Sequence, residues 1–442
     1  MGSIRKRRLN SSHVIILGFS VAILTGALLL MLPISSASGR WTSFSDAVFT
    51  ATSAVCVTGL AVHDTATYWS LFGQAVILGM IQIGGLGIVT IAVSAIMISG
   101  KKIGLMQRST MQEAISAHHV GGIIRLTGFI IKTTFVIELI GAVLLSPVFV
   151  KEFGLRGIWM SAFHSISAFC NAGFDLMGIR EPFSSLTAYS SDTLINIVIM
   201  LLIIIGGIGF LVWDDIRNNK YHWKRYRMQT KVVLLTSAVL IILPAIYFYF
   251  SEFSHISGKD RFFSALFQAV TPRTAGFNTA DLNKLSPTGL LVTIILMLIG
   301  GSPGSTAGGM KTTTVAVLLF TTISVFFKKD DVECFDRRVA DLTIRNTVAI
   351  LLMYLTLFIT GGVIISNIEG LPLMTCLFET ASAIGTVGLS LGITGTLCGL
   401  SRAILIILMF FGRVGGLTVI FAAISNKGLN ISKKPLEKIT VG

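Results

Sequence analysis

The feature that most constrains the fold is a short glycine-centred segment that occurs four times along the chain. Each copy places a small or β-branched residue before a glycine and a large apolar residue after it, and each follows an apolar run that contains phenylalanine. The copies are Cys56-Val57-Thr58-Gly59-Leu60, Cys170-Asn171-Ala172-Gly173-Phe174, Arg273-Thr274-Ala275-Gly276-Phe277 and Gly385-Thr386-Val387-Gly388-Leu389. Because these glycines recur every 103 to 114 residues, the pattern predicts four repeats around a shared centre.

The composition indicates a membrane protein. Of the 442 residues, 53% are hydrophobic and only 13% are charged, whereas a soluble protein carries about 25% charged residues. Eight apolar runs are each about long enough for a ~30 Å hydrocarbon core, at 14–32, 69–98, 129–150, 194–213, 232–250, 290–327, 348–365 and 404–424. The sequence therefore predicts an all-α membrane protein with eight transmembrane helices; its place in a bacterial plasma membrane is an expectation that rests on the family resemblance given below.

The net charge of +14 is placed unevenly along the chain. If the N-terminus is inside, 23 of the 35 basic residues fall on the inner segments and eight on the outer ones. The positive-inside rule then places both termini in the cytoplasm. Orientation in the membrane is thus enough to explain where the basic residues lie, so we expect no nucleic-acid partner.

Each glycine segment follows an apolar stretch that is too short to cross a bilayer at ~1.5 Å per residue, such as 45–55 and 162–169. We therefore expect four re-entrant half-helices. Irregular backbone at membrane depth persists only where it is buried in protein or lines a polar cavity. The predicted fold is four fused span–pore-loop–span repeats around a central pore.

The predicted organisation divides the chain into repeats and cytoplasmic connections. The repeats are 1–100, 126–216, 231–327 and 346–425, the connections are 101–125, 217–230 and 328–345, and the cytoplasmic tail is 426–442. The first and third connections carry mixed charge, and we expect amphipathic surface helices there. No connection is long enough for a nucleotide-binding domain, so nucleotide regulation would come from another chain.

The glycine segments fit a selectivity filter. A cation filter replaces hydration water with backbone carbonyls, which requires φ values that glycine accepts at little cost. The half-helices would also present their partially negative C-terminal ends to the axis, which favours cations. The candidate filter residues, whose carbonyls would bind K⁺, are Val57, Thr58, Gly59, Asn171, Ala172, Gly173, Thr274, Ala275, Gly276, Thr386, Val387 and Gly388. The alternative is four packing loops without conduction.

The third inner span is interrupted by a glycine-rich segment, and this segment is a candidate gate. Its residues are Gly301, Ser302, Pro303, Gly304, Ser305, Thr306, Ala307, Gly308 and Gly309. A broken helix leaves carbonyls unpaired, and a guanidinium has five donors to offer them. Arg413, inside the last apolar run, costs ~2.5–3.5 kcal/mol at the centre of a span, so we expect it beside the pore, holding 301–309 across the path. The alternative is a packing or snorkelling arginine.

Other functions find weaker support. The five cysteines show no metal-ligand spacing and indicate no disulfide. The run from Gly304 to Lys311 departs from phosphate-loop spacing, and hydrolase motifs are absent, so we expect no enzyme. A secondary transporter with discontinuous helices, coupled to Na⁺ or H⁺, is the main alternative. Asp64, Asp175 and Glu138 are its candidate coupling residues.

On the four loops, the broken third inner span and Arg413, the chain resembles the Trk/Ktr/HKT superfamily of potassium transporters over about 14–425. The resemblance is closest to the bacterial KtrB-type membrane subunit. It implies K⁺ as the transported ion, Na⁺ as a candidate activating ion, filter glycines at 59, 173, 276 and 388, and a gate at 301–309. It also implies a homodimer on a KtrA-type cytoplasmic regulatory ring, with ATP or ADP bound only to that partner and no cofactor in this chain. Every loop lacks the Thr-Val-Gly-Tyr-Gly pattern of potassium channels.

Overall fold

The computed structural model describes residues 11–99, 104–115, 122–423 and 437, and these are mostly helical. The basic clusters at 5–8, 101–102 and 427–438, the chain termini and all but one residue of the expected tail 426–442 lie outside the described residues.

One order of helices occurs four times: a long helix, a short helix and then two further helices in succession. The long helices are α1 (Ser11–Met31), α7 (Ile123–Phe153), α11 (Met228–Phe250) and α15 (Asp341–Glu369). The short helices are α2 (Phe44–Val55), α8 (Arg156–Phe169), α12 (Gly258–Val270) and α16 (Leu373–Gly385). The last two positions hold α4 (Leu71–Leu86) and α5 (Ile88–Ile98), α9 (Thr193–Ile208) and α10 (Phe210–Asn219), α13 (Pro287–Leu298) and α14 (Thr312–Phe326), and α17 (Gly399–Val414) and α18 (Gly416–Ala423).

The long helices have the composition of membrane spans. Among the described residues, four helices are long and apolar enough to cross a membrane, or up to six if each strongly bent pair counts as one span. On α7, a stripe of Phe135, Leu139 and Val143 is exposed at helical spacing, while Leu145 and Phe149 are buried. A continuous exposed apolar stripe of this kind is suited to contact with lipid. The chain is therefore a mostly helical, multi-pass membrane protein.

The helices that follow each glycine loop are broken more often than the sequence analysis expected. It placed a break only in the third repeat, whereas α4 and α5 meet at 94° and α9 and α10 at 91°, and α17 also ends before α18. The breaks lie at Gly87, Gly209 and Gly415, with φ of +85°, +106° and +89°. A helix cannot continue through such values, and glycine adopts them without a steric penalty. A hydropathy pattern does not reveal this change of direction, because the helices begin and continue as one apolar run on both sides of the glycine.

The connection at 328–345 also differs from expectation. In place of an amphipathic helix it forms a hairpin of β1 (Glu333–Cys334) and β2 (Arg337–Arg338), and α15 already begins at Asp341. The first connection does contain a helix, α6 (Leu105–Ile115). The all-α prediction is thus correct apart from this small hairpin.

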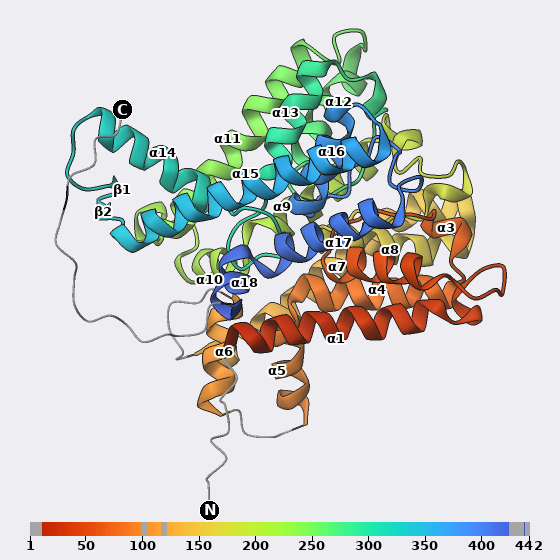
Figure 1. Ribbon diagram of the computed structural model, residues 1–442, viewed down its shortest axis with the longest axis horizontal. Coiled ribbons are helices and arrows are strands. Elements are labelled where there is room, and N and C mark those ends of the chain that lie inside the picture. The colour runs from red at the N-terminus through yellow and green to blue at the C-terminus, as the bar shows by residue number, and fades with distance from the viewer. Residues whose placement is uncertain (1–10, 100–103, 116–121, 424–436, 438–442) are drawn as a thin grey trace, which may run out of the picture.

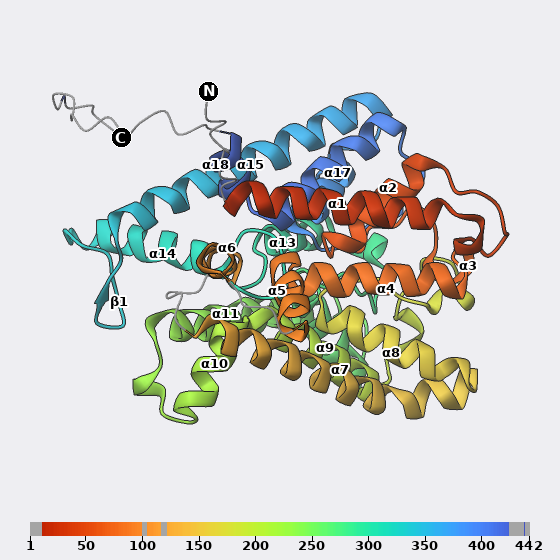
Figure 2. The ribbon, with the colours of Figure 1, turned by 90° about the horizontal axis from the view of Figure 1, so that it is seen from below.

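The C-terminal halves of the short helices are largely buried. Their phenylalanines, at equivalent places in the four repeats, are all fully buried or nearly so: Phe49, Phe163, Phe267 and Phe378. They belong to one apolar core that joins all four repeats. The long helices α1 and α15 run roughly along the longest axis, with the small helix α3 (Thr65–Tyr68) at one end and α14 and the hairpin toward the other (Figures 1 and 2).

Candidate functional site

The four glycine loops begin where the four short helices end, and they share an unusual backbone. The glycine φ values are +89° at Gly59, +68° at Gly173, +78° at Gly276 and +94° at Gly388, and φ is also positive two residues earlier, at Val57, Asn171, Thr274 and Thr386. Non-glycine residues rarely adopt positive φ, least of all β-branched ones. Such strain persists only where the surroundings over-determine it, and it clusters at functional sites.

The four glycines close into a ring. A Cβ added to Gly59 would lie 2.5 Å from the Ala172 oxygen, and one added to Gly173 would lie 2.8 Å from the Ala275 oxygen. A Cβ on Gly276 would meet the carbonyl of Val387, and one on Gly388 would meet the carbonyl of Thr58. Each loop therefore packs against the next, and the fourth packs against the first. No side chain fits on any of the four glycines without moving backbone.

Three of the loops are held by the same hydrogen bond. The N–H of the residue before the glycine donates to a carbonyl five residues earlier, from Thr58 to Ser53, Ala172 to Ser167 and Val387 to Ser382, each at 2.8 Å. The third loop differs, because Ala275 donates to Thr271 at 3.0 Å. Equivalent bonds give the first, second and fourth loops equivalent conformations.

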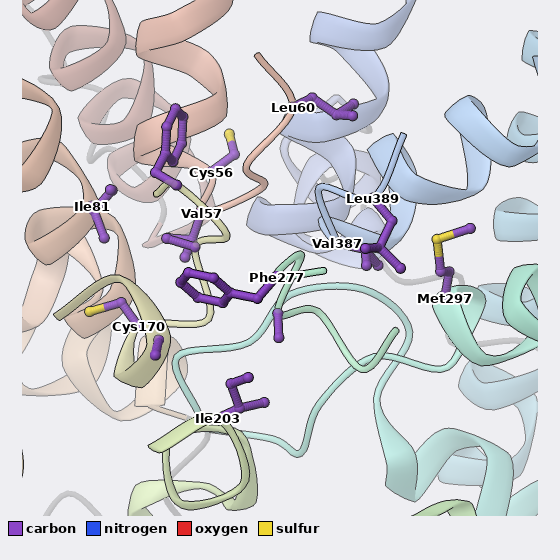
Figure 3. Packing of buried hydrophobic residues seen from close by; sticks show 14 of the residues in the cluster. Cys56, Val57, Leu60, Ile81, Cys170, Ile203, Phe277, Met297, Val387 and Leu389 are labelled. Carbon is purple, nitrogen blue, oxygen red and sulfur yellow. The ribbon is translucent and has the colours of Figure 1, made fainter. Parts of the chain in front are cut away.

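The backbone oxygens of these loops have no protein partner. Within the described residues, no N–H or O–H group donates to a carbonyl oxygen of 57–59, 171–173, 274–276 or 386–388. These residues are buried or nearly so, and buried carbonyls are normally paired. Figure 3 shows Val57, Phe277 and Val387, from three of the loops, gathered around one centre. A desolvated cation is the partner that such oxygens can bind.

A cavity of about 770 Å³ lies on one side of the ring and is lined by all four glycines. Its acidic lining residues are Asp64, Asp175, Glu181 and Asp281, and no lysine or arginine of the described chain joins them. Burial raises the pKa of Asp175 to about 7, although the Met177 N–H donates to its carboxyl at 2.9 Å. We call this cavity the vestibule. Its charge concentrates cations in front of the ring.

The segment 301–309 lies on the other side of the ring and is tied to the other repeats. The Ser302 N–H donates to the Gly207 oxygen at 3.0 Å, and the Gly309 N–H donates to the Gly412 oxygen at 3.1 Å. The Thr306 hydroxyl donates at 3.0 Å to the carbonyl of Phe169, the last residue of α8. The segment is therefore held directly beneath the second glycine loop, and it crosses between α9 and α17.

Arg413 joins this segment to the first repeat. Its guanidinium donates to the carbonyl oxygens of Thr306 and Gly84, and to that of Gly85 at 3.2 Å. These contacts connect α17, the broken segment and the C-terminal turn of α4. The Arg413 side chain thus links three repeats. Its expected place beside a pore and its role in gating stay proposals.

The family model for TrkH, described as a cation transport protein, matches residues 7–431. The chain belongs to the TrkH family. The protein is 40% identical over 450 residues to the potassium/sodium uptake protein NtpJ of Enterococcus hirae, covering 99% of this chain and 98% of that protein. It is also 40% identical to the Ktr system potassium uptake protein B of Bacillus subtilis, covering 96% and 95% of the two chains.

The fold of this TrkH-family chain is similar to a solved structure, the potassium transporter TrkH from Vibrio parahaemolyticus. The TM-score is 0.72 at 19% identity, and the match covers 95% of this chain and 86% of that one. At this identity the likeness concerns the fold. The family confirms the resemblance inferred from the sequence, and it consists of cation transport proteins rather than enzymes.

The sequence analysis missed one residue of this region, Lys311. Its ammonium donates to the carbonyl oxygens of Ala307 at 2.8 Å and Gly308 at 3.4 Å, so it folds back onto the broken segment. The sequence signal that could have identified Lys311 is its place at the end of a glycine-rich interruption, in an apolar run with no other charged residue. A cation at that place has few acceptors within reach except the carbonyls that the broken helix leaves unpaired.

Of the three candidate coupling residues, Asp64 and Asp175 line the same cavity, whereas Glu138 lies apart from them. Glu138, on α7, accepts two hydrogen bonds from the Gln82 amide at 3.0 and 3.1 Å, behind the second loop. Asp64 accepts backbone N–H bonds from Ala66 and from Phe183, both at 3.0 Å, and lies in the vestibule with Asp175. No group of three or more His, Cys, Asp or Glu side chains in the described part of the chain could hold a metal ion.

Proposed function

We propose that this TrkH-family protein takes up K⁺ through a central pore whose selectivity filter is the ring of four glycine loops. The observation that carries the proposal is the set of unpaired carbonyl oxygens at 57–59, 171–173, 274–276 and 386–388, in loops that pack as a closed ring. In a conducting filter such oxygens replace the hydration shell of the ion. The names of the relatives, which include potassium uptake proteins, support the choice of ion.

In this proposal each repeat crosses the membrane twice, giving eight crossings and four re-entrant half-helices. The vestibule faces outward, where its carboxylates gather cations. The broken segment 301–309 is a gate beneath the filter, held by Arg413 and Lys311. The charge of these two side chains also repels a cation at the inner mouth of the filter. Opening requires that the segment moves away from the Gly207 and Gly412 carbonyls.

The proposal extends to partners. The similarity to a Ktr system potassium uptake protein supports a homodimer seated on a cytoplasmic nucleotide-binding ring of KtrA type. ATP or ADP would then act on the ring alone, and Na⁺ would act as an activating ion. Both termini would be cytoplasmic.

A coupled secondary transporter remains the second candidate, because Glu138 is a buried carboxyl within an apolar helix. Flux in proteoliposomes separates the two. If the protein is a channel, an opposing Na⁺ or pH gradient leaves the direction of K⁺ flux unchanged. If a Na⁺ or H⁺ gradient drives K⁺ against its own gradient, the protein is a coupled carrier and the channel proposal is wrong.

A further inference from the structure

A second cavity, of about 340 Å³, lies on the far side of the broken segment from the filter. We call it the inner cavity. Residues from α1, α15, the breaks between α4 and α5 and between α17 and α18, and the broken segment line it. Two cationic side chains, Lys311 and Arg413, are among them, and no aspartate or glutamate of the described chain is. Its charge is therefore opposite to that of the vestibule.

Helix N-termini add to this positive charge. The first residues of α5, α10 and α18, and Lys311 at the N-cap of α14, all line the inner cavity. Figures 1 and 2 place α10, α14 and α18 in the half of the molecule away from α3. A helix N-terminus carries roughly half a positive charge and unpaired N–H groups. On α5, the N–H groups of Ile88, Val89 and Thr90 have no acceptor among the described residues.

Two hydroxyls in the inner cavity also have no partner. Thr90 is 2% exposed and Thr314 is 8% exposed, and both line the cavity. Neither side chain makes a hydrogen bond within the described residues. By contrast, the hydroxyl of Thr321, about two turns further along α14, donates to the Val317 carbonyl at 2.8 Å. The two hydroxyl oxygens are not fully enclosed by protein and open onto the cavity, so both are free to donate to a group bound there.

We infer that the inner cavity is a binding site for a phosphate-type oxyanion, supplied either as free phosphate or as the head group of an anionic lipid. Two cations without a counter-ion in a site of low dielectric are costly. An oxyanion relieves this cost and accepts hydrogen bonds from lysine, arginine, hydroxyls and helix N-termini together. At about 30 Å³ per water molecule, the volume holds a partly hydrated anion or a head group. This site goes beyond the proposed transport of cations. It shares Lys311 and Arg413 with the proposed gate, but it is tested by binding and not by flux.

The test uses the purified full-length protein in lipid nanodiscs. In phosphatidylcholine discs, inorganic phosphate is titrated and its Kd is measured by calorimetry, with the melting temperature followed in parallel and choline chloride as the ionic-strength control. In a second set, discs contain phosphatidylglycerol and no phosphate. We expect saturable stabilisation in at least one set. Stabilisation by inorganic phosphate in phosphatidylcholine discs identifies a free anion as the ligand. Stabilisation by phosphatidylglycerol alone identifies a lipid head group.

Three variants locate the site. Lys311→Met removes one charge-assisted contact and should weaken binding about tenfold. Thr314→Val keeps the side-chain size and should weaken it less, while Thr321→Val on the same helix should leave it unchanged. Stabilisation absent from both sets of discs, or equal in all three variants and the wild type, would overturn the inference. If Lys311→Met does not fold, the comparison between the two threonine variants decides.

Discussion

Gly276 and Gly173 lie so close together that a Cβ on Gly276 would stand 3.1 Å from the Cα of Gly173. The same Cβ would stand 3.2 Å from the Cα of Gly388 and would also meet the carbonyl of Val387. The third loop is thus in contact with the loops on both sides. A change at this one glycine has to move two other filter loops, although all three are far apart in the sequence.

We therefore expect Gly276→Ser to reduce K⁺ uptake by about tenfold or more, or to reduce the preference for K⁺ over Na⁺ by a similar factor. The added side chain would displace carbonyls that are proposed to bind the ion. The matched control is Gly370→Ser, since Gly370 also has positive φ, at +66°, but has open space around a Cβ. Uptake and Na⁺ competition that are the same in both variants would refute a filter role for Gly276.

The second prediction concerns the gate. Arg413→Ala removes the hydrogen bonds that link the Thr306 and Gly84 carbonyls through this side chain. Shortening the segment within 302–308 is a second way to disturb the same link. Both changes should raise K⁺ flux several-fold and weaken its control by regulatory partners. Arg402→Ala is the control, because Arg402 lies on the same helix but pairs with Asp46 at 2.7 Å on the vestibule side. Wild-type flux and regulation in both gate variants, once inserted normally, would place the gate elsewhere.

The third prediction is a pH dependence from the vestibule. Burial raises the pKa of Asp175 to about 7, so its carboxyl is charged above that pH and neutral below it. The apparent affinity for K⁺ should then fall by about threefold as the external pH drops from 8 to 6, because one negative charge is lost near the filter. Asp175→Asn should abolish this change. The matched control is Asp281→Asn, which removes a different vestibule carboxylate and should leave the pH dependence in place. A pH profile unaltered by Asp175→Asn would contradict the assignment.

The fourth prediction concerns nucleotides. No connection in the chain is long enough for a nucleotide-binding domain, so the purified protein alone should not bind ATP or ADP. Equilibrium dialysis with labelled ATP measures this, and a KtrA-type protein, the proposed partner, is the positive control. Micromolar ATP binding to this chain by itself would show that regulation is built into the membrane subunit.

The sequence predicted much of the filter region because glycine carries local information. A glycine between a small and a large apolar residue, after a short apolar run, located the four loop glycines, Gly59, Gly173, Gly276 and Gly388, all of which have positive φ. It did not predict positive φ at Val57 or Thr274, because β-branched residues avoid that conformation in isolation. Only contacts with neighbouring loops enforce it there, and such contacts are not visible along a single stretch of sequence.

The broken helices were harder to predict. The interruption at 301–309 was evident because it contains proline and several glycines, whereas the breaks at Gly87, Gly209 and Gly415 rest on one glycine each within apolar runs. Isolated glycines are common in membrane helices and usually mark close packing. Gly84, Gly206 and Gly412 do that here, because a Cβ on each would meet the C-terminal carbonyls of the short helix in its own repeat. The two uses of glycine look alike in sequence.

The central claim is that the ring of four glycine loops binds the transported cation. Diffraction from crystals grown in Rb⁺, recorded at the rubidium absorption edge, tests it most directly, because Rb⁺ substitutes for K⁺ and its anomalous signal identifies it. We predict an anomalous peak on the axis between Gly59, Gly173, Gly276 and Gly388, within coordination distance of carbonyls from all four loops. Rubidium peaks elsewhere in the protein, with none on this axis, would contradict the account.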